Sequence, residues 1–98
     1  MWQEQDSVID RMSDTTTMEY TAHARRAISE RMIHLEWVER AISEPDLRAD
    51  DPDDIEIERF YKRISEQDDR VLRVAVNTRV TPWRIVSVFF DRGMRTKL

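Results

Sequence analysis

Apolar residues recur at helical spacing in two neighbouring stretches of the N-terminal half. The first stripe consists of Ala24, Ala27 and Ile28. With Thr21 as an N-cap, this stripe predicts a helix over residues 21–32. The second stripe consists of Leu35, Trp37, Val38, Ala41 and Ile42. It predicts a second helix over residues 33–43, which Pro45 ends because the residue before a proline is driven out of the helical region.

After residue 54 the pattern changes to alternation and to β-branched and aromatic residues. Residues 55–64 also fit a helical period, but their Ile-Glu-Ile-Glu alternation favours a strand. Residues 70–77 are interpreted as a strand because apolar side chains alternate with polar ones. Residues 83–90 carry apolar side chains at both odd and even positions, which point to opposite faces of a strand. This pattern predicts a central strand with both faces covered. Residues 78–82 are expected to join these last two strands as a hairpin.

The order of these elements predicts an α+β fold, with two N-terminal helices followed by a three- to four-stranded antiparallel sheet. Residues 1–18 show no sustained period, so we expect a flexible N-terminal extension before a single domain over residues 19–98. Residues 45–54 are predicted to form an acidic connector between the helices and the sheet. Residues 91–98 are predicted to form a basic tail.

The chain has no cysteine, which excludes disulfides, thiolate-bound metals and a cysteine nucleophile. A small secreted domain without disulfides is unusual, so we expect a cytoplasmic protein. No apolar run is long enough to cross a bilayer, and the acidic N-terminus does not resemble a signal peptide. The acidic run over residues 50–54 lacks the glycine and the terminal glutamate of a calcium loop, and no glycine-rich loop precedes a helix. We therefore predict no metal, no cofactor and no association with membranes.

The net charge of −4 conceals a strong asymmetry along the chain. Residues 45–58 carry a net charge of −6 and residues 59–98 carry +6, and fourteen of the sixteen basic residues are arginine. Arginines interleaved with aromatic residues can hold phosphates and stack nucleic-acid bases, which predicts RNA binding by the C-terminal sheet. The candidate nucleic-acid-binding residues are Arg73, Arg84, Arg92 and Arg95. In the alternative interpretation, the arginines only neutralise the acidic connector and the aromatic residues fill the core.

Four short sequence motifs occur in a fixed order along the chain. A Tyr-Thr-x-His-Ala helix start is followed by a downstream arginine, a valine-rich strand and a final strand that runs into Asp-Arg-x-Met-Arg. These motifs lie in the stretches YTAHARRAISERMIHLEWVERAISEPD, ERFYKRI, RVLRVAVNTRVTPWRIVSVFFDR and MRTKL. In this order and spacing, residues 19–98 resemble the domain-of-unknown-function family 4258. That family is similar to the BrnT-type and RelE-type toxins, whose compact α+β fold supports RNA cleavage.

The resemblance implies a metal-independent ribonuclease, in which a 2′-hydroxyl attacks the adjacent phosphate. It implies His23 as an acid or base, with Arg31 and Arg92 as further catalytic residues. Two positions depart from the family's pattern, because Ala27 and Gly93 stand where arginines are usual. If those arginines act in the family's reaction, this chain is weakened or inactive.

A non-catalytic alternative uses the same basic surface. It is an interaction module that binds RNA or an acidic partner protein, such as an antitoxin, with an affinity that falls as the salt concentration rises. In a third interpretation, the basic surface packs against the acidic connector or against a second copy of the chain, which would give a homodimer.

Overall fold

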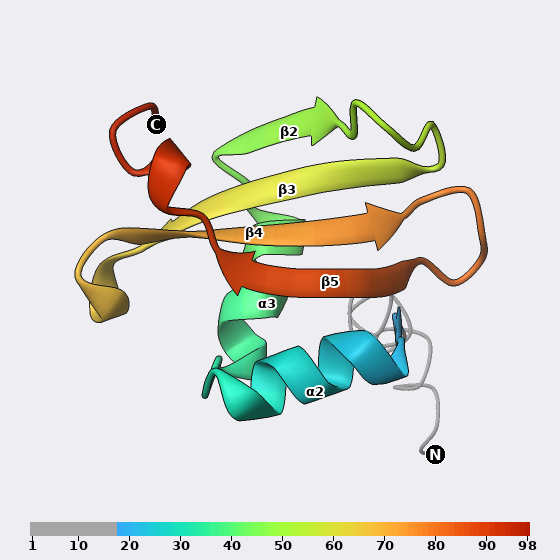
Figure 1. Ribbon diagram of the computed structural model, residues 1–98, viewed down its shortest axis with the longest axis horizontal. Coiled ribbons are helices and arrows are strands. Elements are labelled where there is room, and N and C mark those ends of the chain that lie inside the picture. Colours follow the sequence, from blue (N-terminus) through green and yellow to red (C-terminus); the bar gives the residue numbers. More distant parts are fainter. Residues whose placement is uncertain (1–17) are drawn as a thin grey trace, which may run out of the picture.

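The computed structural model describes residues 18–98, which form a five-stranded sheet and two α-helices (Figure 1). The regular elements are β1 (Glu19–Tyr20), α2 (Ala22–Glu30), α3 (Leu35–Ser43), β2 (Leu47–Asp50), β3 (Ile57–Ile64), β4 (Arg70–Asn77) and β5 (Arg84–Phe90). Two short 3₁₀ turns, η1 (Ser65–Gln67) and η2 (Arg92–Met94), follow β3 and β5. The strands lie in the order β1-β5-β4-β3-β2. The predicted extension over residues 1–18 lies outside the described residues except for Met18, whose side chain is buried.

The fold is α+β, but the predicted arrangement of two helices followed by a three- to four-stranded antiparallel sheet is wrong. β1 precedes both helices and pairs with β5 in parallel, so the sheet is mixed and the helices lie between strands in the chain. The predicted acidic connector contains β2, which pairs with β3 in antiparallel fashion. The sheet therefore has five strands rather than three or four.

The two strands that were not predicted are too short for a periodic signal. β1 contains two residues, and the neighbouring Thr21 N–H donates to the Ile85 carbonyl at 3.0 Å. β2 contains four residues inside a segment rich in acids and proline, a composition that favours a loop. In both cases pairing with a longer neighbouring strand outweighs weak local propensity.

The two predicted helices are confirmed with shorter bounds. The side-chain oxygen of Thr21 accepts a hydrogen bond from the Ala24 N–H at 3.1 Å, which confirms the predicted N-cap of α2. The Thr21 hydroxyl also donates to the Val86 carbonyl at 3.3 Å, so the cap ties α2 to β5. Ala24 and Ala27 are buried, and their small side chains let α2 lie close to the sheet.

The three predicted strands are confirmed over most of their length. β3 pairs with β4 and β4 pairs with β5, both in antiparallel fashion. The register of the second pair shifts between Ala75 and Val76, which leaves Val86 of β5 as the extra residue of a bulge. The bulge helps to explain why apolar residues stand at both odd and even positions of β5, the pattern that predicted a central strand. β5 does lie between two strands, β4 and the two-residue edge strand β1, but one of its two faces is not covered by a helix.

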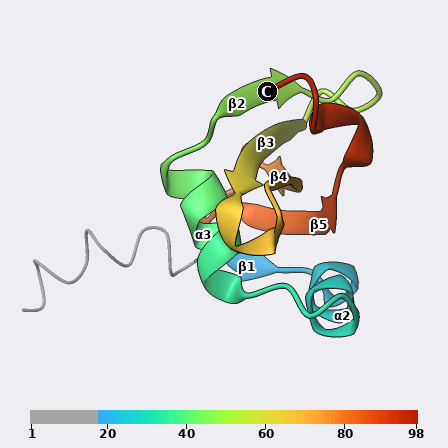
Figure 2. The same cartoon turned by 90° about the vertical axis from the view of Figure 1, so that its left-hand side faces the viewer.

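The two helices pack against different parts of the sheet (Figures 1 and 2). α3 crosses one face behind β3 and β4, whereas α2 runs along the β5 edge. The core includes buried side chains from α3 and from the adjoining sheet face: Trp37, Val38, Phe60, Leu72, Val74 and Ile85. The other face of the sheet is not covered by a helix, and we call it the open face. No helix within residues 18–98 is long and apolar enough to cross a membrane.

Candidate anion-binding site

A pocket of about 410 Å³ lies where β5 runs into residues 91–98, which we call the C-terminal segment. The residues that line this pocket are Arg70, Val71, Phe90, Asp91, Arg92 and Arg95. Three of them are arginines and one is an acid, so the lining is basic. Strand pairing creates the cluster, because the partners Leu72 and Phe90 place the start of β4 beside the end of β5.

The first arginine of the pocket is held by an aromatic ring. The guanidinium carbon of Arg70 lies 4.2 Å from the centre of the Phe90 ring, in a cation–π contact. Phe90 meets Trp37 of α3 edge-on, with 6.2 Å between the ring centres, and Trp37 is buried. The core therefore fixes the ring on which Arg70 rests, and the ring leaves the charge of Arg70 uncancelled.

The second arginine of the pocket is held by the backbone of the β3–β4 turn. Arg95 donates from Nη2 to the Asp68 carbonyl at 2.7 Å. Asp68 and Asp69 have φ angles of 56° and 60°, in the left-handed region that residues with side chains rarely adopt. Such strain persists only where surrounding contacts stabilise it, and the bond from Arg95 is one of these contacts.

Arg63 of β3 fastens the C-terminal segment to the same turn. Its Nη1 donates to the Asp69 carbonyl at 2.8 Å. Its Nη2 donates to the carbonyls of Arg95 at 2.7 Å and Leu98 at 3.1 Å. One guanidinium thus joins two segments through three main-chain acceptors, of which the carbonyls of Asp69 and Arg95 are neutral. Arg63 positions the wall of the pocket that contains Arg92 and Arg95.

Asp91, the acid in the lining, is engaged by other partners. Its Oδ1 accepts a hydrogen bond from the Gly93 N–H at 3.0 Å, and its Oδ2 lies 3.6 Å from Nη1 of Arg73. Within residues 18–98, no carboxylate forms an ion pair with any of the three pocket arginines. Three guanidinium groups whose charge is not cancelled create a positive potential that favours a bound anion.

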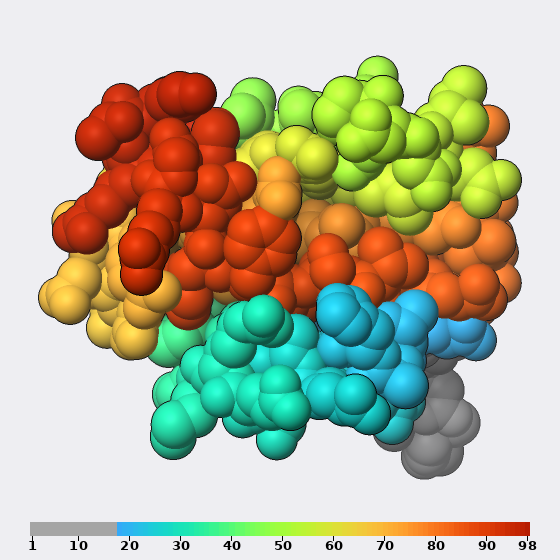
Figure 3. All heavy atoms as spheres, viewed as in Figure 1, coloured from blue at the N-terminus to red at the C-terminus, as the bar shows by residue number. Residues whose placement is uncertain are grey.

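A second stacked arginine, Arg73, lies on the open face, whereas Arg70 and Phe90 of the pocket point to the side of α3. The guanidinium carbon of Arg73 on β4 lies 4.3 Å from the centre of the Phe89 ring on β5. The two residues are partners in the β4–β5 register, so they share one face of the sheet. In Figure 3 this face is exposed between the C-terminal segment and α2. A guanidinium stacked on a ring is a surface on which nucleic-acid bases can stack.

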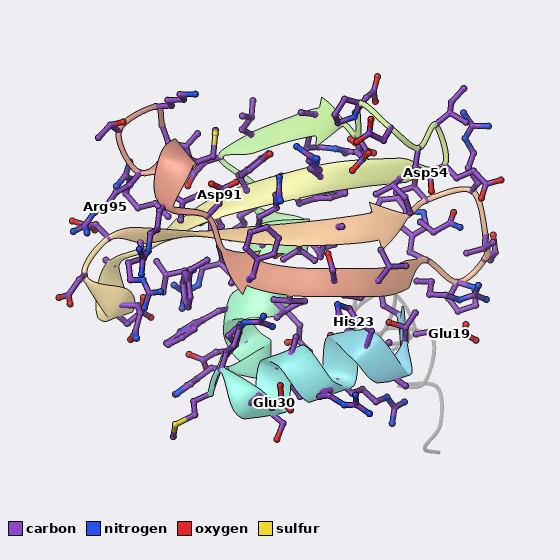
Figure 4. All side chains as sticks on the ribbon, in the orientation of Figure 1. Glu19, His23, Glu30, Asp54, Asp91 and Arg95 are labelled. Atoms are coloured by element: carbon purple, nitrogen blue, oxygen red, sulfur yellow. The ribbon has the colours of Figure 1, made fainter. Side chains whose placement is uncertain are left out.

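The structure does not bring His23 into the arginine pocket. His23 is exposed in the first turn of α2, and Figure 4 places it well away from Arg95. Arg31 is the C-cap residue of the same helix, and the helical rise puts it about 12 Å from His23 along the axis. Arg92 lies in η2 and lines the pocket. The geometry therefore brings Arg92 together with Arg95 and leaves His23 apart from both.

Arg84, another predicted nucleic-acid-binding residue, lies at the far end of β5 from the pocket, where its Nη2 is 3.3 Å from the Glu19 carboxylate. Arg59 likewise lies 3.2 Å from Asp51 of the acidic connector. Burial lowers the pKa of Arg59, but hydrogen bonds with Tyr61 and Asp51 outweigh burial and raise the pKa overall. The acidic connector thus neutralises the charge of Arg59 but not the charge of the pocket arginines.

No group of three or more metal-ligating side chains occurs in the part of the chain that the structure describes.

The predicted site residues do not include Arg63 and Arg70. Arg70 could have been found from the hairpin, because antiparallel pairing of residues 70–77 with 83–90 places residue 70 opposite the start of the basic tail. For Arg63 the sequence holds no comparable signal, because its partners are backbone carbonyls of two other segments. Local motifs do not encode such contacts.

A protein-family model described as a domain of unknown function, DUF4258, matches residues 20–90. The match spans both helices and β2 to β5, and it ends at Phe90. The wall of the pocket that contains Arg92 and Arg95 therefore lies just beyond the matched region. No curated protein and no solved structure gave a significant match to the chain.

Proposed function

The chain belongs to the domain-of-unknown-function family DUF4258, and we propose that it binds RNA through a surface formed by its C-terminal half. We call this the arginine surface, and it consists of Arg70, Arg73, Arg92 and Arg95. The proposal depends on one observation: three of these arginines line a single pocket, and no carboxylate of residues 18–98 pairs with them. Guanidinium groups bind phosphate oxygens through two parallel hydrogen bonds, which makes RNA a suitable polyanionic ligand.

The stack of Arg73 on Phe89 supports a nucleic acid over a simple anion. Single-stranded RNA exposes its bases, which stack on aromatic rings and on guanidinium planes. Asp91 links the stack to the pocket, because it lines the pocket and pairs with Arg73. A strand that passes over the end of the sheet at Asp91 would place bases on the open face and a phosphate in the pocket. We propose RNA over DNA because of the resemblance to BrnT-type and RelE-type toxins.

Fluorescence anisotropy of a labelled single-stranded RNA, measured at several salt concentrations, tests the proposal. For the wild type we expect the affinity to fall steeply with salt, because each phosphate contact releases counterions. For the Arg92→Gln/Arg95→Gln variant we expect binding weaker by roughly tenfold or more, because two phosphate contacts are lost. The slope of log affinity against log salt should become shallower by about 1.4, at about 0.7 per contact on a single strand.

The Arg25→Gln/Arg79→Gln variant is the matched control. It removes the same charge from two exposed arginines that do not line the pocket. We expect it to retain the affinity and the salt slope of the wild type. An equal loss in both double variants would mean that only net charge governs binding. A wild-type protein that binds no RNA at any salt concentration would refute the proposal.

The toxin resemblance leads us to propose RNA cleavage as a second activity that can be separated from binding. His23 is exposed on α2, and α2 borders the open face along β5 (Figures 1 and 4). The imidazole of His23 can accept or donate a proton, which is the chemistry needed at a 2′-hydroxyl. Because Arg31 and Arg92 lie apart from His23, we place only His23 at the reacting phosphate.

A gel assay with end-labelled RNA separates cleavage from binding. We expect the wild type to cut the RNA in the presence of EDTA, because the proposed reaction uses no metal. We expect His23→Gln to abolish cutting and to bind RNA with unchanged affinity. RNA that stays intact with the wild-type protein would exclude cleavage and leave the proposed binding activity in place.

A further inference from the structure

The charge of the arginine pocket suits a phosphate monoester better than a phosphodiester. The lining contains three arginines and Asp91, which gives a net charge of +2. A phosphodiester within an RNA strand carries one negative charge, whereas a phosphate monoester carries about −1.5 to −2 at neutral pH. The monoester alone comes close to neutralising the lining.

The pocket also has hydrogen-bond donors to spare. Each guanidinium has five N–H groups, and a phosphate monoester has three strongly accepting terminal oxygens. Arg95 is fixed by its bond to the Asp68 carbonyl, and Arg70 is fixed by stacking on Phe90, which uses no N–H group. Two of the three arginines are thus positioned before a ligand arrives, and this lowers the entropy lost on binding.

We propose that the pocket binds the terminal phosphate of an RNA strand, so that the protein recognises strand ends that have a phosphate monoester. This inference rests on the proposed RNA binding. Asp91 lies between the pocket and Arg73, at 3.6 Å from Arg73, so the terminal nucleotide is expected to reach the stack of Arg73 on Phe89. The nearby stacking surface favours a phosphate attached to RNA over free phosphate.

Three internally labelled RNA strands of one sequence test the inference. One has hydroxyl groups at both ends, the second has a 5′-phosphate and the third has a 3′-phosphate. In anisotropy titrations we expect one phosphorylated strand to bind about tenfold tighter than the hydroxyl strand at neutral pH. This gain should shrink toward about pH 5, because the monoester loses its second charge with a pKa near 6.

The Arg92→Gln variant shows whether the pocket reads the phosphate. Arg92 is exposed, so its replacement is expected to preserve the fold, which urea unfolding checks. We expect this variant to bind all three strands more weakly, because one phosphate contact is lost, and in addition to lose most of the preference for the terminal phosphate. Arg79→Gln is the control with the same change of charge, because Arg79 lies in the β4–β5 connection, outside the pocket. We expect Arg79→Gln to keep the preference.

Each other outcome has a distinct meaning. Equal affinities for the three strands would overturn the inference and leave RNA binding in place. A preference that survives in both Arg92→Gln and Arg70→Gln would also overturn it, because the phosphate would then be read elsewhere. Inorganic phosphate that binds as tightly as the phosphorylated strand would replace the RNA end with free phosphate as the ligand, against the inference. A wild type that binds none of the strands would refute the proposed function itself.

Discussion

The two ends of the sheet hold their arginines in opposite ways (Figure 4). At the end where the acidic connector lies, near Asp54, three arginines are paired with carboxylates: Arg48, Arg59 and Arg84. Arg48 of β2 and Glu58 of β3 form two hydrogen bonds, with 2.6 Å from Nε to Oε2 and 2.8 Å from Nη2 to Oε1. Hydrogen bonding to Glu58 raises the pKa of Arg48. Such a carboxylate positions the arginine and cancels its charge at the same time.

At the other end, near Arg95, the pocket arginines Arg70 and Arg95 have neutral partners. Arg63 and Arg95 donate to backbone carbonyls, and Arg70 rests on the ring of Phe90. Carbonyls and rings fix a guanidinium without cancelling its charge. The positive potential at this end of the sheet therefore remains available to a ligand.

A protein with a negative net charge can thus present an anion-binding surface at one end of its sheet. The net charge of −4 gives no indication of such a surface, and the number of arginines does not locate it. What matters is which partner orders each arginine. A phosphate that approaches the acidic end must displace a carboxylate, whereas a phosphate that approaches the pocket finds donors already in place.

Arg63→Ala is expected to have the largest effect on stability and on RNA binding, because Arg63 joins the β3–β4 turn to the C-terminal segment. Losing three hydrogen bonds from a charged donor is expected to lower the free energy of unfolding by about 2 kcal/mol. RNA binding should weaken as well, because the segment that contains Arg92 and Arg95 loses its attachment. Urea unfolding and anisotropy measure the two effects.

Arg63→Lys is the control for charge. Lysine keeps the positive charge but lacks the planar fork that reaches three acceptors. We expect it to recover less than half of either loss. If lysine recovered stability and RNA affinity in full, the positive charge of residue 63 would be responsible for both, and not the hydrogen bonds of Arg63 to main-chain groups.

Arg48→Ala is expected to produce the opposite pattern at the acidic end. Arg48 pairs with Glu58 and lies 4.6 Å from the centre of the Phe60 ring. Its side chain is half exposed, so we expect the free energy of unfolding to fall by only about 1 kcal/mol. RNA affinity should not change, because the pair has no net charge to offer. A loss of RNA affinity as large as that of Arg92→Gln would remove the distinction between the two ends.

Elements with long periodic patterns could be predicted from the sequence. The spacing of apolar residues and the Thr21 cap predict α2, and an alternation over eight residues predicts β4. β1 and β2 contain two and four residues, and their hydrogen bonds come from strands distant in the chain. The bulge at Val86 depends on how β4 and β5 pair, which no local pattern specifies.

The candidate site could be predicted only as far as its composition. Arg84 and Arg92 flank the same strand and look equivalent in the sequence. The structure pairs Arg84 with Glu19, which lies 65 residues away in the chain, and it leaves Arg92 in a pocket with two other arginines. Sheet topology selects these partners. Which charges are cancelled is therefore a property of the fold that residue types and spacing do not reveal.

Asp91→Asn is expected to make the basic end more attractive to RNA by a modest amount. The change removes the acid from the pocket lining and frees the charge of Arg73. Asparagine can still accept the hydrogen bond from the Gly93 N–H, so η2 should keep its cap. One removed charge near a bound phosphate corresponds to roughly threefold tighter binding at low salt. Unchanged or weaker binding in anisotropy would mean that the phosphate does not lie near Asp91.

The smallest expected effect concerns a carboxylate pair near the basic end, between Arg40 of α3 and Glu66 of η1. Nη2 of Arg40 lies 2.8 Å from Oε2 of Glu66, and hydrogen bonding to Arg40 lowers the pKa of Glu66 from 4.5 to about 2. The folded-state pKa is below the ordinary value, so the pair stabilises the protein above about pH 4.5 and this stabilisation is lost as the pH falls toward 2. Its size is small because both side chains are in contact with solvent.

Glu66→Gln should therefore be slightly less stable than the wild type at neutral pH. The difference in unfolding free energy should shrink as the pH falls from about 4.5 toward about 2 in urea titrations. A difference that stays constant over this range would show that Glu66 acts through packing rather than charge. RNA affinity should be unchanged, because the partner of Glu66 is Arg40, which does not line the pocket. Glu66 would then affect stability but not RNA binding, although it lies close to the basic end. The partner of each arginine, and not the position of that arginine along the sheet, would therefore decide whether the arginine can bind RNA.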